Sequence, residues 1–374
     1  MARIVYALSG QGRGHGSRVE AMTEELRRRG HTVTFACGGP ARARLVARGE
    51  AVTPVPALVQ RFRGNHLDIA ATAFANARAV LGGVRVVRET AAALDALAPD
   101  LVVSDFEAFV PRAARRLGLP VVSLCRQEVL TETRYRLPPE QRMGALFISA
   151  VVGTLVPRRG IARRIVTTLA DAPLRHPERA GKGGAPGGAV LVGPIFRDAV
   201  LAARPSVGEH VVAYLNVSRG LDATLAALAA SGVPVRLYGV SPSDTAVRAR
   251  SLAFCAPGDD DAFLADLASA RAVVSTAGFT LLSECLHLGK PVLTLPNGGI
   301  FEQTFNALQL ERVGAGRAIH DRPPTSEDVR MFRRDRDTFS PDGAALLKPG
   351  RDAAADEIEA CLARPSTRAT PRLP

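Results

Sequence analysis

Short apolar runs alternate with amphipathic stretches along most of the chain, a pattern that predicts parallel strands connected by helices. The clearest example covers residues 271–316. An apolar run at 272–275 predicts a buried strand, and Gly278 separates it from a stretch with apolar residues at helical spacing. Gly289 ends that helix before a second strand at 292–295. The order strand, tight turn, helix, strand, loop, helix indicates an α/β fold.

The first turn of this segment suits a phosphate group. A strand that leads through a tight turn into a helix directs backbone N–H groups and the positive end of the helix at one point. Glu284 lies on that helix, within reach of a group beyond the phosphate. Glu302 and Gln303 open the next helix, where a carboxylate and an amide can hold hydroxyls.

Residues 271–316 resemble the nucleotide-sugar-binding signature of GT-B glycosyltransferases, the group that includes the UDP-glycosyltransferases and the MurG-type enzymes. The donor-binding residues that the resemblance implies here are Thr276, Ala277, Gly278, Phe279, Thr280, Glu284, Glu302 and Gln303. It assigns the diphosphate to the turn, the ribose hydroxyls to Glu284, and the sugar hydroxyls to Gln303 with Glu302. Many relatives have His in place of Thr276 and Asp in place of Glu302. The alternative is an ordinary βαβ unit in which Gly and Pro only make turns.

A glycine-rich loop follows the first expected strand, residues 3–8. The dinucleotide fingerprint G-x-G-x-x-G, counted from Gly10, requires a third glycine where this chain has His15. The expected second strand ends at Cys37 instead of an acidic residue that could hold a ribose. NAD binding is therefore disfavoured.

The loop instead resembles the G-x-G-x-G-H-x-x-R segment after the first strand of GT-B enzymes, in which the His is often the base that deprotonates the acceptor. His15 is the catalytic candidate on this resemblance, because a neutral imidazole can take a hydroxyl proton near neutral pH. The alternative is a His that caps the following helix or binds the donor phosphate. Gly14 beside it is a donor-binding candidate.

Asp105 follows the expected strand 100–104, at the carboxyl end where parallel sheets place their sites. In UDP-glycosyltransferase relatives an Asp at this position orients the catalytic His. The alternative is an N-cap for the helix that starts near Phe109. Asp105 and Glu107 also form a D-x-E pattern, but further ligands are missing from the surrounding sequence. We therefore expect no metal and no cofactor.

The second half of the chain offers further donor contacts. These candidates are Ser218, Arg219, Gly220, Cys255 and Ala256. The first three lie in the turn between strand 210–216 and a helix, where they could meet the diphosphate. The last two follow a strand after which relatives hold the nucleobase with backbone groups. The acidic run 259–261 opens a helix and is interpreted as a cap.

Composition narrows the choice of partners. The formal net charge of +12 comes almost entirely from Arg, which favours an anionic donor, an anionic membrane surface, or both. Nucleic acid is disfavoured, because Trp is absent, there are four Tyr, and no basic run is interleaved with aromatics. Five dispersed cysteines indicate a reduced, cytoplasmic protein.

The uncharged, mostly apolar segment 143–157 is too short to span a bilayer. It has Arg142 on one side and Arg158, Arg159, Arg163 and Arg164 on the other. It is either an interfacial helix with a basic rim, at the inner face of the membrane, or the lining of an apolar acceptor cleft. Both readings indicate a partly apolar small-molecule or lipid acceptor.

The chain of 374 residues is long enough for two domains. We expect the GT-B arrangement of two facing Rossmann-like domains with parallel sheets: an acceptor domain at 1–199, a donor domain at 209–350, and a C-terminal helix and tail at 351–374 that crosses back to the first domain. The expected activity is inverting, metal-independent sugar transfer from a nucleoside diphosphate sugar, with UDP as the expected nucleotide. A nucleotide-sugar 2-epimerase and a non-catalytic nucleotide-sugar-binding helper are the alternatives.

Overall fold

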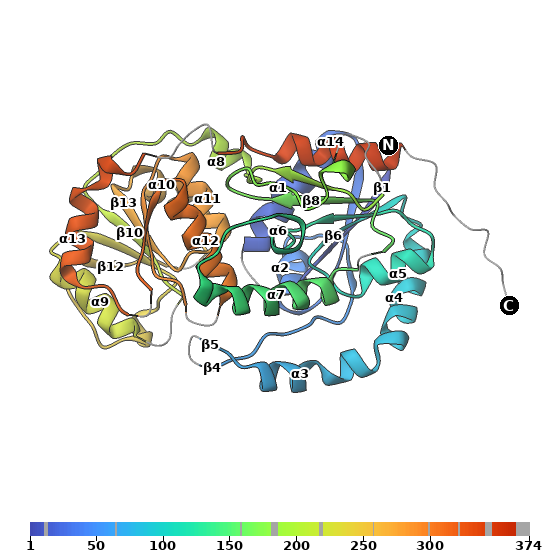
Figure 1. Ribbon diagram of the computed structural model, residues 1–374, viewed down its shortest axis with the longest axis horizontal. Coiled ribbons are helices and arrows are strands. Elements are labelled where there is room, and N and C mark those ends of the chain that lie inside the picture. Colours follow the sequence, from blue (N-terminus) through green and yellow to red (C-terminus); the bar gives the residue numbers. More distant parts are fainter. Residues whose placement is uncertain are drawn as a thin grey trace. The chain divides into compact units, whose positions relative to one another are not determined.

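The computed structural model describes residues 1–10, 14–63, 66–157, 159–180, 186–216, 220–256, 258–297, 300–320, 322–340 and 346–363, with the side chains of residues 14, 15, 62, 66 and 67 outside the description. Two compact units are present (Figure 1). Unit 1 consists of Met1–Arg61, Ile69–Arg197 and Leu347–Pro374. Unit 2 consists of Phe62–Asp68 and Asp198–Leu346.

Unit 1 is built on a parallel seven-stranded sheet with strand order β3-β2-β1-β6-β7-β8-β9. Its strands are β1 Arg3–Leu8, β2 Thr32–Cys37, β3 Val52–Pro54, β6 Leu101–Asp105, β7 Val121–Leu124, β8 Arg163–Thr167 and β9 Ala189–Val192. Alternate side chains of β1 enter different cores: Ile4 and Tyr6 join one cluster, and Val5 and Ala7 join another. Both faces of the sheet are therefore covered, which explains why its strands appear in the sequence as continuous apolar runs.

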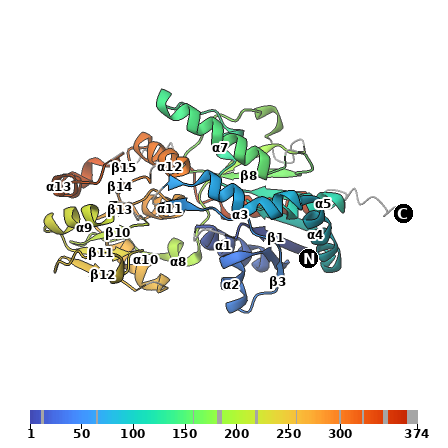
Figure 2. The same ribbon diagram turned by 90° about the horizontal axis from the view of Figure 1, so that it is seen from below.

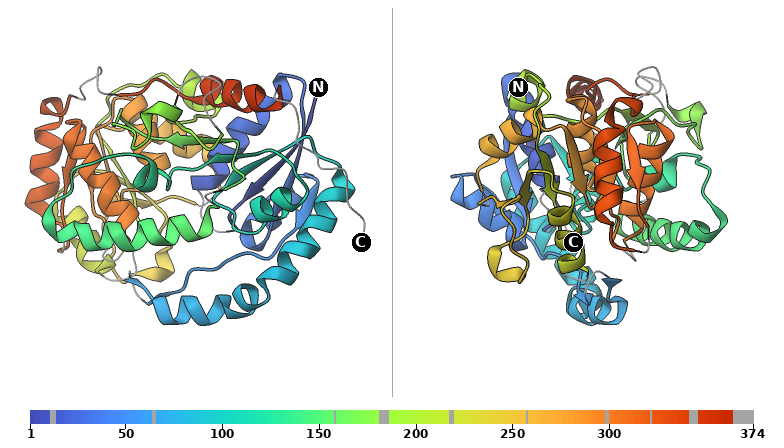
Figure 3. Two further views of the ribbon diagram at one scale, coloured as in Figure 1. Left: turned by 45° about the vertical axis from the view of Figure 1, so that its right-hand side comes forward. Right: turned by 90° about the vertical axis from the view of Figure 1, so that its left-hand side faces the viewer.

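The helices of unit 1 are α1 Gly14–Arg28, α2 Gly39–Ala47, α3 Ile69–Leu81, α4 Gly83–Leu97, α5 Val110–Arg116, α6 Val129–Glu132, α7 Arg142–Leu155 and α14 Arg351–Leu362, with 3-10 turns η1 Pro139–Gln141 and η2 Pro177–Arg179. The C-terminal α14 lies along α1 (Figure 3). Its Ala354 and Ile358 enter the same core as Ile4 and Tyr6. The last helix thus completes the core that the first strand begins.

Strand β8 was not expected, because two of its five residues are arginines. Both are buried: Arg163 donates to Glu357 of α14 at 2.7 Å, and Arg164 pairs with Glu128. They therefore cannot belong to a basic rim beside the apolar segment 143–157, and that part of the prediction is wrong. Each charge is tolerated inside the unit because a carboxylate from a distant part of the chain neutralises it.

Unit 2 has a parallel six-stranded sheet with order β12-β11-β10-β13-β14-β15, which Figure 2 shows in sequence from β15 to β12. Its strands are β10 Val211–Tyr214, β11 Val235–Tyr238, β12 Leu252–Phe254, β13 Ala272–Ser275, β14 Val292–Thr294 and β15 Gly316–Ala318. Its helices are α8 Asp198–Ala202, α9 Leu221–Ala230, α10 Asp260–Ser269, α11 Phe279–His287, α12 Phe301–Arg312 and α13 Ser326–Arg334, with η3 Pro242–Asp244, η4 Arg336–Thr338 and the antiparallel pair β4 Phe62–Arg63 and β5 His66–Leu67. Helices α9 and α13 lie on one side of the sheet, opposite α10 and α11 (Figure 2).

Each sheet has one point at which the strand order reverses. In unit 1, β1 lies between β2 and β6, and in unit 2, β10 lies between β11 and β13. Helices that leave neighbouring strands in opposite directions open a crevice at the carboxyl ends of the strands, where open α/β sheets bind their ligands. Ligand-binding residues are therefore expected in four loops, those after β1, β6, β10 and β13.

Candidate functional site

The loop after β13 holds the turn from Thr276 to Gly278, at the reversal point of unit 2. Ala277 has a positive φ of 61°, which is uncommon for a residue with a Cβ. The Ala277 carbonyl accepts a 3.0 Å hydrogen bond from Nδ2 of Asn306, a buried residue of α12. The turn is thus held in a strained conformation by the neighbouring helix.

Helix α11 starts directly after this turn, with Gly278 at its N-cap and no side-chain cap hydrogen bond. The first N–H groups of a helix have no acceptor within the helix and favour a negative charge. Phe279 and Thr280 supply the first turn, and Glu284 lies on the same helix with its side chain largely buried. This arrangement places a helix N-terminus, which favours a negative charge, and a carboxylate along one short helix.

Helix α12 contributes the next pair of candidates, Glu302 and Gln303, in its first turn. The side-chain oxygen Oε1 of Gln303 accepts a 2.8 Å hydrogen bond from the backbone N–H of Asn297. Side-chain Nδ2 of Asn297 in turn donates to the carbonyl of Asn216, just after β10, at 2.9 Å. The start of α12 is therefore tied to the strand on the far side of β13.

Of the remaining donor candidates in unit 2, the structure describes three and leaves two outside the described residues. Gly220 has φ 77° and is the N-cap of α9 without a side-chain cap, while Ser218 and Arg219 lie outside the described residues. Cys255 is partly exposed and Ala256 is exposed. Both follow β12, three strands from β13 and therefore roughly 14 Å along the sheet from the turn at Thr276–Gly278.

At the reversal point of unit 1, Asp105 ends β6 and is completely buried. Its carboxylate binds the Arg18 guanidinium at two positions, Nε to Oδ2 at 2.9 Å and Nη2 to Oδ1 at 2.5 Å. Burial by itself lowers the pKa of Arg18, but the charge and hydrogen bonds of Asp105 outweigh it and raise that pKa. Phe106, the next residue, has a positive φ of 56°.

Asp105 does not cap α5; Glu107 takes that role by accepting a hydrogen bond from the N–H of Val110. Burial raises the pKa of Glu107 to about 7, although the backbone N–H groups of Phe109, Val110 and Ala108 act in the opposite direction. The loop after β1 lies beside Asp105, whose carbonyl accepts from the Ser9 N–H at 3.1 Å. The side chain of His15, in the first turn of α1, lies outside the description, so the predicted His15–Asp105 contact stays a prediction.

Comparison with known proteins identifies the family of this chain. The profile of glycosyl transferase family 1 matches residues 2–334. The chain belongs to glycosyl transferase family 1. An uncharacterized glycosyltransferase of Methanosarcina acetivorans is 24% identical over 359 residues, which cover 86% of this chain and 87% of that protein.

Solved structures share the fold of this glycosyltransferase. The kitacinnamycin glycosyltransferase superposes with a TM-score of 0.65 at 19% identity, covering 96% of this chain and 99% of that one. The glycosyltransferase VinC in complex with dTDP superposes with a TM-score of 0.60 at 14% identity, with the same coverage. The chain is thus a glycosyltransferase of the GT-B type with two Rossmann-like parallel-sheet domains, as the sequence predicted.

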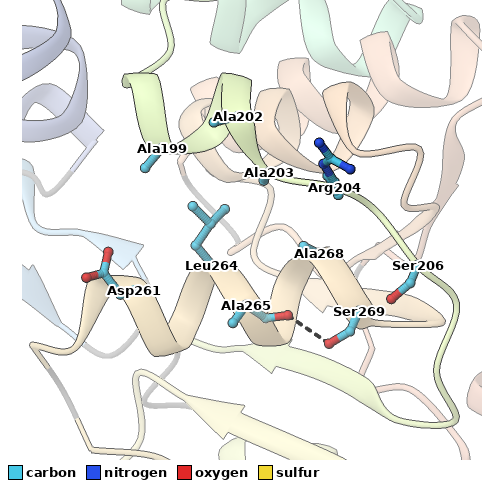
Figure 4. Close-up of a pocket in the computed structure, with 10 residues that line it drawn as sticks. All are labelled: Ala199, Ala202, Ala203, Arg204, Ser206, Asp261, Leu264, Ala265, Ala268 and Ser269. Carbon is cyan, nitrogen blue, oxygen red and sulfur yellow. Dashed lines mark hydrogen bonds between the residues drawn. The ribbon is translucent and has the colours of Figure 1, made fainter.

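A groove of ≈ 430 Å³ lies elsewhere in unit 2 of this glycosyltransferase, between α8 with the segment after it and α10 (Figure 4). Small side chains such as Ala202 and Ala268 form its walls. The Ser269 hydroxyl already donates to the Ala265 carbonyl at 2.7 Å, the bond drawn in Figure 4. The Ser206 carbonyl already accepts from the Lys290 ammonium. The polar groups of Ser269 and Ser206 are therefore already engaged within unit 2.

Three residues of the site were missed from the sequence. Arg18 stands three positions after His15 in the loop motif, a helical spacing that could have placed both on one face. Asn306 and Asn297 gave no signal, because an Asn in a helix or beside Gly-Gly is ordinary. The acidic run was interpreted correctly: Asp259 caps α10 by accepting from the Ala262 N–H at 2.8 Å.

Proposed function

We propose that this glycosyltransferase moves a sugar from a nucleoside diphosphate, with UDP as the first choice of nucleotide, to a partly apolar acceptor. The transfer inverts the anomeric carbon and needs no metal. The observation that carries the proposal is the strained turn at Ala277, which Asn306 holds in front of the N-terminus of α11. A preorganised helix N-terminus binds a diphosphate and stabilises it as a leaving group without reorganising.

The donor is assigned along unit 2 on this basis. The diphosphate meets Thr276, Ala277 and Gly278, with Arg219 and Gly220 as further partners. Glu284 takes the ribose hydroxyls, because it follows the phosphate turn on the same helix. Glu302 and Gln303 take the sugar, and backbone groups at Cys255 and Ala256 take the base. The VinC neighbour carries dTDP, so thymidine diphosphate donors belong in the same trial as uridine diphosphate donors.

His15 is the proposed base. Position 15 lies one helical turn before Arg18 on the same side of α1, and the Arg18 guanidinium reaches Asp105. A carboxylate oxygen can accept more than one hydrogen bond, so Asp105 can bind Arg18 and orient an imidazole together. His15 takes the proton of the acceptor nucleophile, which forms a bond to the anomeric carbon while the bond from that carbon to the diphosphate oxygen breaks.

An apolar surface on unit 1 supports the choice of acceptor. Met143, Leu146 and Phe147 share one side of α7 and are exposed at 74%, 65% and 45%. Helix α3 buries none of its residues and exposes Phe74 at 86%. Neither helix contains an acidic residue. We propose that this basic protein contacts an anionic membrane surface from the cytoplasmic side through these helices, close to a lipid-like acceptor.

Within the described residues, no helix is both long and apolar enough to cross a bilayer. The family match and the named relatives favour a transferase, so a 2-epimerase is not proposed.

The deciding experiment is a thermal-shift trial with UDP- and dTDP-sugars, followed by product analysis with and without apolar acceptors. A selective donor should raise the melting temperature by mass action. If no nucleoside diphosphate sugar raises the melting temperature, the proposed donor is refuted. A donor that is consumed without an acceptor, giving an epimer, would refute transfer.

A further inference from the structure

Asn297 connects three elements at the reversal point of unit 2. It follows β14 and is 5% exposed. Its backbone N–H binds Gln303 at the start of α12, and its side-chain Nδ2 binds the Asn216 carbonyl just after β10. Strands β14 and β10 are separated by β13, so this connection crosses roughly 10 Å of sheet. Asn297 therefore passes over the end of β13, where the diphosphate turn begins.

The side-chain oxygen of Asn297 has no hydrogen-bond partner in the part of the chain that the structure describes. Its orientation is fixed, because the Asn216 carbonyl requires a donor and so holds the Nδ2 end. Buried acceptors in folded proteins are nearly always satisfied, and an exception needs an explanation. A hydrogen-bond donor outside the described residues is therefore expected at Oδ1.

The chemistry of that group can be narrowed. Phosphate oxygens are acceptors with negative charge, and an amide oxygen would repel them. Gln303, which Asn297 binds directly, stands in the first turn of α12 beside Glu302. Because Oε1 of Gln303 is already occupied by the Asn297 N–H, its Nε2 is the end that remains to meet a ligand. The Asn297 amide oxygen and the Gln303 amide nitrogen belong to two residues in direct contact, and together they are complementary to sugar hydroxyls.

We propose that Asn297 is a sugar-specificity residue, whose Oδ1 accepts a hydrogen bond from one hydroxyl of the transferred sugar. The inference rests on the proposed donor site in unit 2. It has a definite consequence: the enzyme prefers a donor that carries this hydroxyl over the corresponding deoxy sugar. A site built to bind a hydroxyl rejects the analogue that lacks it, because the polar group of the protein is then left unpaired.

The test compares Asn297→Leu with wild type by calorimetry. The probes are UDP, dTDP, UDP-glucose, UDP-galactose, UDP-N-acetylglucosamine and dTDP-glucose, and the tightest nucleotide sugar is then compared with its single deoxy analogues. Leu has a similar size and keeps the backbone N–H that binds Gln303. We expect about 10- to 100-fold weaker binding of the nucleotide sugar by the variant, with the free nucleotide changed less than about twofold. One deoxy analogue should bind wild type more weakly than the parent nucleotide sugar by the same factor. The variant should bind that analogue and the parent sugar equally.

Asn306→Leu is the matched control, since it removes the amide that holds the Ala277 turn. It should weaken the free nucleotide and the nucleotide sugar equally. If Asn297→Leu behaves like this control, or leaves every affinity unchanged because water satisfies Oδ1, the inference is overturned. Equal binding of all deoxy analogues by wild type overturns it without any variant. If wild type binds none of the probes, the proposed donor site itself has failed.

Discussion

The proposed catalytic pair makes the most exacting prediction, through the substitution Asp105→Asn. Asparagine has nearly the same shape as aspartate but cannot neutralise Arg18 or stabilise a protonated imidazole at position 15. General-base catalysis contributes about 10²- to 10⁴-fold, so His15→Ala should lower the rate of transfer by that factor. Asp105→Asn should cause a similar loss, because it presents the imidazole with an amide and risks the wrong tautomer.

The structure adds a second expected effect to Asp105→Asn. Asp105 is completely buried and binds Arg18 at two positions. Breaking a buried pair from one side costs about 3–5 kcal/mol. At about 2–4 °C for each kcal/mol in a domain of this size, the melting temperature should fall by roughly 6–20 °C. His15→Ala leaves the Arg18–Asp105 pair intact, so its melting temperature should fall less.

These two effects can be separated with a double variant. Asp105→Asn with Arg18→Met removes both buried charges, so it should recover part of the melting temperature while the rate stays low. Rates are measured at saturating donor, below the melting temperature of every variant, together with donor affinity. His15→Ala combined with Asp105→Asn should be barely slower than either alone, because residues that act as a unit are non-additive. If the rate losses of the two single variants multiply in the double variant, or if Asp105→Asn keeps the wild-type rate, the proposed pair is refuted.

Four further outcomes are expected. Glu284→Ala should weaken donor binding by about 1.5–3 kcal/mol while the saturated rate changes less, and an unchanged donor dissociation constant would remove its ribose role. Transfer should persist in EDTA, whereas loss restored by magnesium would point to a metal. Leu146→Gln with Phe147→Gln should reduce co-sedimentation with anionic vesicles relative to neutral ones; equal binding of wild type to both vesicle types contradicts the membrane proposal. The folded protein keeps the Glu107 proton up to about pH 7, so unfolding free energy should fall from pH 5 to 7, and Glu107→Gln should flatten that slope in urea titrations.

The donor unit was the more predictable part of the fold. Strands β13 and β14 were visible as apolar runs, because parallel strands covered on both sides contain few polar residues. Strand β8 was invisible, because the partners of Arg163 and Arg164 lie 194 and 36 positions away. Edge strands β3 and β15 gave no signal, because their sequences, VTP and GRA, contain no apolar run.

The candidate site was predictable where backbone geometry defines it. A glycine between a strand and a helix predicts an anion-binding turn at Gly278, and a carboxylate at a strand end draws attention to Asp105. Side chains that act across the sheet were not predictable. Arg18 and Asp105 are separated by 87 positions, and Asn297 reaches a carbonyl 81 positions earlier. Only the strand order brings them together.

The two reversal points share a structural device that no single residue reveals. In each, the chain leaves a central strand through a non-glycine residue with positive φ, Phe106 after β6 and Ala277 after β13. Such backbone strain persists only when the surroundings impose it. At Ala277 the restraint is the Asn306 amide on the carbonyl. On either side of Phe106, Arg18 fixes the Asp105 carboxylate and the start of α5 fixes the Glu107 carboxylate. Glycine would relieve the strain but make both turns more flexible in the unfolded chain and in the native state. A turn that must present N–H groups to a diphosphate, or hold a carboxylate toward a base, gains from rigidity, so strain at these two strand ends is consistent with their proposed roles.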